Sequence, residues 1–194
     1  MKIFSEYTTF YTQEFQSKQI LNIFKKHLEN LENLEHNKSN YTIVDATAGI
    51  GGNSSLFCEF FNYVYCIDTY ENVIDYLENN LKEYNNKFII NENCLDILKI
   101  IQYDIIFFDP PWGGSSYKRQ KNIDLYINDI NIIDIINELY HNKKLKIIGL
   151  KAPINFNLDF DAYLNTDFRW KVNIYDIYKN DNKYTLFKFL VFTK

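Results

Sequence analysis

Short apolar runs alternate along this chain with longer stretches in which apolar residues recur every three or four positions. The runs are rich in β-branched and aromatic residues, as buried strands are, and cover residues 41–44, 64–67, 88–90, 105–108 and 145–150. The intervening stretches have the spacing of helices that bury one face; examples are Val73, Ile74, Leu77 and Leu81, and Ile127, Ile130, Ile133, Ile136 and Tyr140. This alternation predicts an α/β fold with parallel strands.

The two ends of the chain depart from this alternation. Residues 17–34 predict an N-terminal helix with Ser17 as its cap. Residues 171–178 and 184–193 predict two strands joined by a turn at 180–182, which is an antiparallel hairpin. Trp170 precedes the first of these strands, and we expect it to lie in the core.

The expected architecture is therefore a central, mostly parallel seven-stranded sheet with a C-terminal antiparallel hairpin and helices on both faces. We expect one domain over residues 1–194, with a helical extension over 1–40 and the α/β core over 41–194.

Scarce residues gather directly after the predicted strands. The chain has six Gly and three Pro. Gly49, Gly51 and Gly52 follow the first strand, residues 110–114 (PPWGG) follow the fourth, and Pro153 follows the fifth. Because ligands bind outside the carboxyl ends of parallel strands, we expect the active site at that edge of the sheet.

The glycine turn over residues 44–53, VDATAGIGGN, lets a ligand approach the backbone closely. A dinucleotide fingerprint would place its third glycine at position 54, where this chain has Ser54, so binding of NAD is disfavoured. Asp68 ends the second strand, where a carboxylate can accept both hydroxyls of a ribose. Together with Asp45 and the exit of the third strand, the turn resembles the S-adenosylmethionine site of Rossmann-like methyltransferases. A structural turn with solvated acids is the alternative.

The loop after the fourth strand, DIIFFDPPWGG over residues 104–114, carries the strongest chemical signal. The carbonyl oxygens of Pro110 and Pro111 and the carboxylate of Asp109 can accept hydrogen bonds from a substrate amine. Trp112 offers a flat surface on which a base can stack, an interaction of about 1–3 kcal/mol. Such a loop can hold an exocyclic amine with its lone pair directed at an electrophilic methyl group.

Two motifs extend this pattern over most of the chain. PPWGGSSY at residues 110–117 and VDATAGIGGN at 44–53 resemble PPWGGxxY and VDxxxGxGGN of the RNA cap guanine-N2 methyltransferases, the trimethylguanosine synthase family. The resemblance implies a Rossmann-like fold and S-adenosyl-L-methionine as cofactor. It also implies that a 7-methylguanosine cap stacks on Trp112 and is methylated on its 2-amino group. The positive charge of a 7-methylated base adds cation–π energy, up to about 2 kcal/mol.

The resemblance also assigns roles to particular residues. Asp45 would lie near the methionine amino group of the cofactor and Asp68 would hold its ribose. Asn93 and the backbone of Cys94 would meet its adenine. The implied cofactor-binding residues are Asp45, Ala46, Thr47, Gly49, Gly51, Asn53, Asp68, Thr69, Asn93, Cys94 and Asp109.

On the substrate side, the resemblance assigns catalysis to Asp109, Pro110 and Trp112. Asp109 and the Pro110 carbonyl would stabilise charge on the attacking nitrogen, with no metal required. The implied substrate-binding residues are Trp112, Tyr117, Lys118, Arg119, Pro153 and Asn155.

Three features depart from the family pattern. Asp109 stands where the family usually has Ser. An Asp at this position resembles the pattern of enzymes that methylate adenine. Ile154 replaces the Arg of a Pro-Arg-Asn segment, and Lys118, Arg119 and Lys121 are candidates to contact the triphosphate instead. The N-terminal extension is short; its aromatic residues, which serve either core packing or a lid, are Phe4, Tyr7, Phe10, Tyr11 and Phe15.

Two other functions therefore stay open. One is an adenine-N6 methyltransferase of DNA or RNA, which would have to extract its base from a helix or act on single strands. The other is a catalytically silent cap-binding module. The cofactor edge is intact, which argues against the silent module; its residues are Asp45, Gly49, Gly51, Asp68 and Asp109.

Composition narrows the remaining classes. The net charge of −4 argues against a grip on long duplex DNA through its phosphates. The three cysteines lack metal-ligand spacing, so we expect reduced buried thiols and no metal site. No apolar stretch approaches the roughly 18 residues of a membrane span. We expect an intracellular monomer that binds capped RNA and no membrane; the nucleus and the cytoplasm are not distinguished.

Overall fold

The computed structural model describes residues 11–31, 39–159, 168–179 and 184–194. It divides into two compact units, residues 1–107 and 108–194. Phe4, Tyr7 and Phe10, the predicted turn at 180–182 and much of the predicted extension lie outside the described residues. The single domain over 1–194 stays a prediction.

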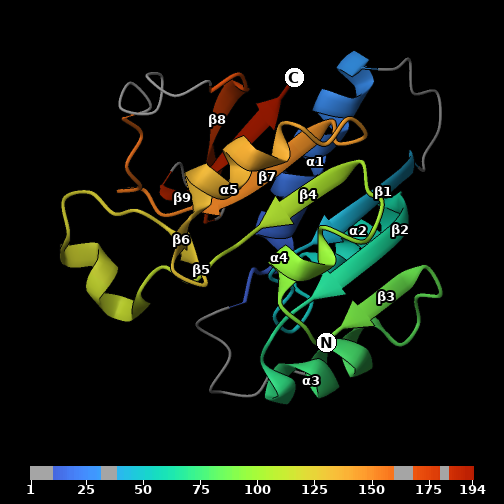
Figure 1. Cartoon of the computed structure of the whole chain (residues 1–194). Helices are drawn as coiled ribbons and strands as arrows, with labels where there is room; N and C mark the ends of the chain where they lie inside the picture. The colour runs from blue at the N-terminus through green and yellow to red at the C-terminus, as the bar shows by residue number, and fades with distance from the viewer. Residues whose placement is uncertain (1–10, 32–38, 160–167, 180–183) are drawn as a thin grey trace. The chain divides into compact units, whose positions relative to one another are not determined.

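In the first unit, parallel strands alternate with helices (Figure 1). Its elements are α1 (Glu14–Leu31), β1 (Ser39–Asp45), α2 (Ser54–Phe60), β2 (Phe61–Ile67), α3 (Glu71–Leu81), β3 (Lys87–Ile90), α4 (Cys94–Ile97) and β4 (Ile105–Phe108). Strand β1 pairs in parallel with β2 and β4, and β2 pairs in parallel with β3. The predicted strands at 41–44, 64–67, 88–90 and 105–108 are thereby confirmed.

The register places the ends of neighbouring strands at one level. Asp45, the last residue of β1, lies opposite Cys66 of β2 and Phe107 of β4. Just beyond it, the N–H of Ala46 donates to the carbonyl of Phe107 at 2.9 Å. The glycine turn therefore begins beside Phe107 of β4.

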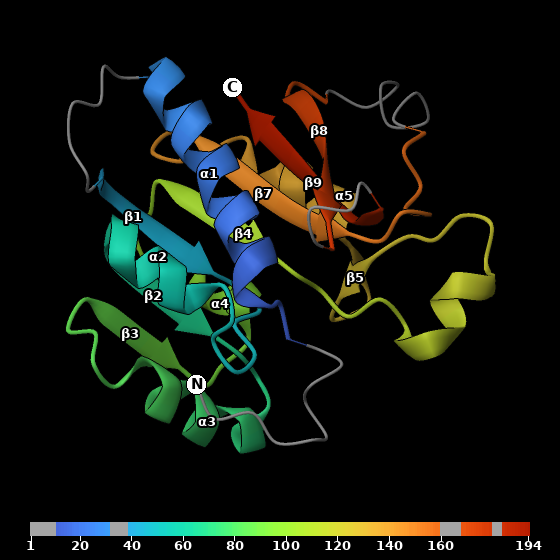
Figure 2. The same cartoon turned by 180° about the vertical axis from the view of Figure 1, so that it is seen from behind.

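An aromatic cluster holds α1 and α2 against the strands of this unit. Phe24 of α1 contacts Phe57 of α2 and Phe107 of β4, with ring centroids 5.9 and 6.5 Å apart. All three rings are fully buried, as is Phe61 of β2 beside them. Viewed from behind, both helices cover the same face of the strands (Figure 2). The cluster fixes the strand ends that carry the glycine turn.

The second unit contains an antiparallel group of strands. Its elements are η1 (Gly114–Arg119, a 3-10 helix), β5 (Tyr126–Ile127), β6 (Ile130–Asn131), α5 (Ile132–Leu139), β7 (Ile147–Ala152), β8 (Lys171–Tyr178) and β9 (Thr185–Thr193). Strand β9 pairs antiparallel with both β7 and β8. The predicted strand pair at 171–178 and 184–193 is confirmed.

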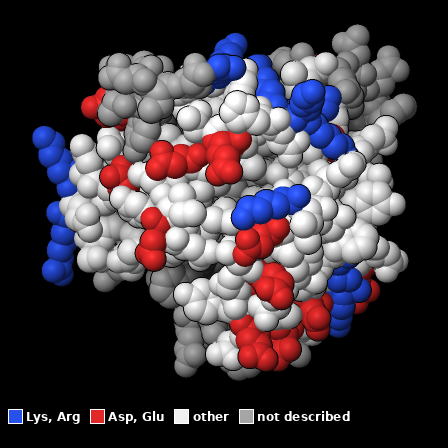
Figure 3. Space-filling view, in the orientation of Figure 1, with Lys and Arg blue, Asp and Glu red and all other residues white. Residues whose placement is uncertain are grey.

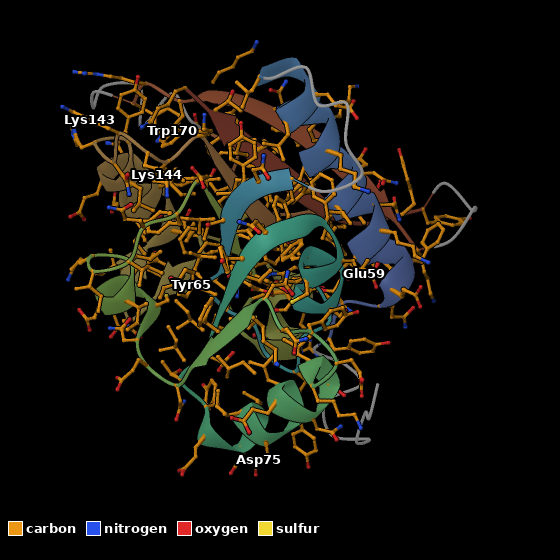
Figure 4. All side chains as sticks on the ribbon, turned by 90° about the vertical axis from the view of Figure 1, so that its right-hand side faces the viewer. Glu59, Tyr65, Asp75, Lys143, Lys144 and Trp170 are labelled. Atoms are coloured by element: carbon orange, nitrogen blue, oxygen red, sulfur yellow. The ribbon has the colours of Figure 1, made fainter. Side chains whose placement is uncertain are left out.

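Trp170 lies in the core of the second unit, as predicted. It is 5% exposed, and its indole Nε1 donates to the carbonyl of Ile136 in α5 at 2.9 Å (Figure 4). The Tyr140 ring meets the indole edge to face at 5.2 Å. These contacts attach α5 to the start of β8.

The seven longer strands follow the order β3-β2-β1-β4-β7-β9-β8. This is the predicted α/β fold, with a mostly parallel seven-stranded sheet and an antiparallel C-terminal pair. The predicted fold class is confirmed.

One predicted helix is wrong at its beginning. The apolar spacing from Ile127 to Tyr140 predicted a single helix, but α5 begins only at Ile132. Asn128 and Asp129 adopt positive φ angles of 49° and 63°, which end any helix and form the tight turn of the β5–β6 hairpin. Side-chain periodicity alone does not detect this turn, because Ile127 and Ile130 suit either structure.

Candidate active site

The glycine turn of the first unit is held in a conformation that favours glycine at two positions. Gly49 and Gly51 have φ angles of +52° and +89°. A Cβ on Gly51 would meet Leu77 of α3 at 3.0 Å, whereas a Cβ on Gly49 would meet nothing within 4 Å. Gly51 is thus favoured by its conformation, and a side chain there would also require Leu77 to shift. Gly49 borders open space, which a ligand can enter.

Asp68 orients this turn. Its Oδ2 accepts from the N–H of Gly49 at 2.8 Å, and its Oδ1 accepts from the N–H of Tyr70 at 3.0 Å. A carboxylate has about four acceptor sites, so two backbone bonds leave capacity for ribose hydroxyls. The sequence placed Asp68 at a strand end but did not reveal that it holds the turn.

Asp45 lies beneath the turn and is 1% exposed. Its Oδ2 accepts from the hydroxyl of Ser54 at 2.6 Å. Ser54, which stands in place of the third glycine of a dinucleotide fingerprint, therefore donates a hydrogen bond to the buried carboxylate of Asp45 at the end of β1. The contact of Asp45 with a cofactor amino group stays a prediction.

Asn53 is directed to the N-terminal segment. Its Oδ1 accepts from the hydroxyl of Ser17 at 2.9 Å, and its Nδ2 donates to Oγ1 of Thr12 at 3.0 Å. A Cβ on Gly52 would approach the Thr12 carbonyl to 2.6 Å, so glycine is required there. The predicted cap role of Ser17 is wrong, because α1 begins at Glu14 and Ser17 lies within its first turn.

The exit of β3 forms a capped turn. Asn93 caps α4, its Oδ1 accepting from the N–H of Leu95 at 3.0 Å. Cys94 is 4% exposed, and burial raises the pKa of its thiol to about 11. The predicted adenine contacts are compatible with this turn and stay predictions. The other predicted cofactor residues are the buried Ala46, the half-buried Thr47 and the exposed Thr69.

In the second unit, Asp109 forms an ion pair that the sequence did not predict. Its Oδ2 lies 2.6 Å from Nζ of Lys151, a buried residue of β7. Burial raises the pKa of the Asp109 carboxyl, and the ammonium of Lys151 opposes this shift. No sequence motif marked Lys151, which directly follows the apolar run at 145–150.

Trp112 is set among aromatic and charged neighbours. Tyr117 meets its ring edge to face at 5.4 Å, and Phe187 of β9 does so at 6.2 Å. Nζ of Lys151 lies over the ring, 5.3 Å from its centroid. The buried indole Nε1 has no hydrogen-bond partner within the described residues. The ring is therefore fixed from several sides, and its indole N–H is buried.

A cavity of about 560 Å³ opens beside Trp112. Pro111, Trp112 and Gly113 line one part of it, and Tyr126, Asn128 and Asp129 of the β5–β6 hairpin line another. The volume falls in the range of small-molecule sites, about 300–1,000 Å³. Its walls combine an aromatic surface with amide and carboxylate groups, the combination that suits a nucleobase.

The remaining predicted substrate residues gather around η1. Nδ2 of Asn155 donates to the carbonyls of Tyr117 and Gln120, each at 2.8 Å, and thereby anchors the end of η1. Pro153 is buried. Lys118 and Arg119 are exposed, and Figure 3 shows basic side chains at the edge over η1. Asn155 thus supports the loop, and Lys118 and Arg119 can meet an anionic ligand. Binding of the substrate by Pro153 and Asn155 stays a prediction.

The described part of the chain shows neither a membrane-spanning helix nor a metal-binding group. No helix there is both long and apolar enough to cross a bilayer. No three His, Cys, Asp or Glu side chains in those residues come together as ligands for a metal ion.

Comparison with known proteins identifies relatives. Residues 40–191 match the RNA cap guanine-N2 methyltransferase family. An uncharacterized protein of Acanthamoeba polyphaga mimivirus is 31% identical over 186 residues, which is 87% of this chain and 72% of the viral protein. Trimethylguanosine synthase of Saccharomyces cerevisiae is 34% identical over 94 residues, which is 43% of this chain and 29% of the yeast protein.

A solved structure shares the fold. It is a proposed methyltransferase from Streptococcus mutans in complex with S-adenosylhomocysteine, with 15% sequence identity and a TM-score of 0.50. The match covers 81% of this chain and 90% of that chain.

Proposed function

Because this chain belongs to the RNA cap guanine-N2 methyltransferase family, we propose that it methylates the exocyclic N2 amine of the 7-methylguanosine cap of RNA, with S-adenosyl-L-methionine as methyl donor. The observation that carries the proposal is the fixed Trp112 ring at the wall of a nucleobase-sized cavity. A cationic base stacked on tryptophan gains cation–π energy that a neutral guanine lacks.

The glycine turn fits the proposed cofactor. Open space beside Gly49 admits its methionine part, and Asp68 retains acceptor capacity for ribose hydroxyls. When bound, S-adenosyl-L-methionine supplies an electrophilic methyl carbon, whose bond to sulfur breaks as the substrate nitrogen bonds to it. Asn93 and the backbone of Cys94 complete the proposed cofactor set on the adenine side.

The chain's own residues contribute positioning and electrostatics. Trp112 fixes the plane of the base, so that the N2 amine is held in one orientation. Asp109 and the carbonyl of Pro110 accept hydrogen bonds from that amine and stabilise the positive charge that develops on nitrogen. Lys118 and Arg119 bind the cap triphosphate. The proposed reaction needs no metal, and a monomer that acts inside the cell stays a prediction.

Methyl transfer to small acceptors tests this function. Labelled S-adenosyl-L-methionine is incubated with 7-methyl-GTP, with GTP and with an adenine-containing oligonucleotide. We expect label in 7-methyl-GTP alone, and at least about tenfold less at low substrate with Trp112→Ala. Trp170→Phe is the matched control, because Trp170 packs against α5 and does not line the cavity. Transfer to GTP as fast as to 7-methyl-GTP would contradict the proposal.

The adenine-N6 alternative is supported by the motif over residues 109–112, DPPW, in which Asp109 replaces the usual Ser of the family. The oligonucleotide in the same assay tests it. A silent cap-binding module would bind 7-methyl-GTP and transfer no methyl group to any acceptor.

A further inference from the structure

Lys151 combines burial, charge and contact with two proposed catalytic residues. Among the described residues it is the only Lys or Arg that is buried, at 7% exposure. Its Nζ lies 2.6 Å from Oδ2 of Asp109 and 5.3 Å from the centroid of Trp112. The same Nζ lies 4.9 Å from the ring of Phe187. A buried ammonium is costly unless it is paired, so this arrangement depends on Asp109.

The position of Lys151 relative to the cavity decides its effect. Lys151 lies over the Trp112 ring, yet it is not among the residues that line the cavity. A base stacked on Trp112 within the cavity would therefore interact electrostatically with the ammonium across the ring, without direct contact. The ammonium of Lys151 and the stacked base would both interact with the electron-rich π system of Trp112.

Two cations that share one ring repel each other. An unbalanced charge on Lys151 would oppose a positively charged 7-methylated base and would leave a neutral guanine almost unaffected. The carboxylate of Asp109 cancels that charge at 2.6 Å. The ion pair as a whole is neutral, so the ring keeps its preference for a cation.

We infer that Lys151 and Asp109 form a charge-balanced pair that determines whether the Trp112 ring prefers a cationic over a neutral base. This inference rests on the proposed function, because it takes Trp112 as the surface on which the base stacks. It makes Lys151 a specificity-determining residue that does not itself contact the substrate. It also gives Asp109, the residue that departs from the family pattern, a partner that accounts for its charge.

A double-mutant cycle tests the pair. Equilibrium binding of 7-methyl-GTP and of GTP is measured by calorimetry for the wild type, Asp109→Asn, Lys151→Met and the double variant. The readout is the ratio of the two dissociation constants within each protein. General damage to the fold affects both ligands, so it cancels in this ratio. Thermal unfolding of each variant is recorded beside it.

We expect the preference for 7-methyl-GTP to fall about tenfold in Asp109→Asn, where Lys151 is left unbalanced. It should stay at or above the wild-type value in Lys151→Met and return to within about threefold of that value in the double variant. Lys188→Met is the matched control, because Lys188 forms a partly exposed ion pair with Asp176 at 2.8 Å. This control should leave the preference unchanged.

The outcomes separate the inference from the proposed function. If the wild type binds 7-methyl-GTP no better than GTP, the proposed function fails. If the wild type shows the preference and Asp109→Asn retains it, the proposed function stands and the charge-balance inference is overturned. A loss of preference in Asp109→Asn that the double variant does not restore would overturn it as well.

Discussion

At the scale of single residues, three of the predicted site residues are carboxylates, and neighbouring groups within the same unit hold at least one oxygen of each. Asp68 accepts from two backbone N–H groups, and Asp45 accepts from Ser54. Asp109 is paired with Lys151. In each case the partner fixes the direction of a charged oxygen, and fixed charges are what a preorganised site requires.

Asp68→Asn should weaken cofactor binding. The amide offers one acceptor oxygen where the carboxylate offers two, so either Gly49 or Tyr70 loses its hydrogen-bond partner and the ribose loses a charged acceptor. We expect the affinity for S-adenosylhomocysteine to fall by about 10-fold to 100-fold, as measured by calorimetry. An affinity equal to that of the wild type would show that Asp68 only shapes the turn.

Ser54→Ala should destabilise the first unit. It removes the 2.6 Å hydrogen bond to the buried carboxylate of Asp45, and a buried acceptor that loses its donor costs about 1–3 kcal/mol. Urea unfolding measures this loss. Ser55→Ala is the control, because the Ser55 hydroxyl makes a longer, 3.3 Å bond to the carbonyl of Gly52 and is half-buried. Equal effects of the two substitutions would refute the special role of Ser54.

At the scale of elements, strands were easier to predict than the segments between them. A run such as Ile105–Phe108 is apolar throughout and is buried throughout, so its composition identifies it. The β5–β6 hairpin escaped prediction because its isoleucines also fit a helical period and only the backbone of Asn128 and Asp129 distinguishes the two. The Thr12 and Ser17 contacts with the glycine turn are long-range, and no local pattern marks them.

Asn155→Ala should loosen η1. The substitution removes both 2.8 Å hydrogen bonds that hold the carbonyls of Tyr117 and Gln120. Trypsin cleaves after Lys and Arg, and η1 ends in Lys118 and Arg119. We expect cleavage there to accelerate by about tenfold, because local opening becomes easier. Asn157→Ala should be cleaved at the wild-type rate, because it removes a 3.3 Å bond to Asp124 and a 3.2 Å bond from the N–H of Asp159 but none to η1.

At the scale of the whole molecule, the two units differ in charge. Lys and Arg outnumber Asp and Glu in residues 108–194, and the reverse holds in residues 1–107. The unit with the proposed substrate residues is thus the more basic one, as binding of an RNA triphosphate requires. The sequence motifs predicted the cofactor-binding and substrate-binding residues, and these roles stay predictions. The motifs could not predict Lys151, because its proposed role depends on its burial and on its ion pair with Asp109, which lies 42 positions away in the chain.

Stability should fall in alkaline solution. Burial raises the pKa of Cys58 to about 12 and that of Cys94 to about 11, from an ordinary value of 9.0. Above about pH 9 the unfolded chain releases thiol protons that the folded chain retains, so the free energy of unfolding decreases as the pH rises through the folded pKa values. Urea unfolding between pH 7 and pH 10.5 measures this decrease. The decrease in the free energy of unfolding should be smaller in a Cys58→Ala variant. A free energy of unfolding that does not change with pH in the wild type would contradict the burial of these thiols.

The identity of the methylated nucleoside tests the central claim most directly. A short RNA with a 7-methylguanosine cap and internal adenosines is incubated with the protein and labelled S-adenosyl-L-methionine, digested to nucleosides and separated. The account predicts label only in cap guanosine that carries methyl groups at both N2 and N7. Label in N6-methyladenosine would contradict it and would show that the protein methylates adenine instead.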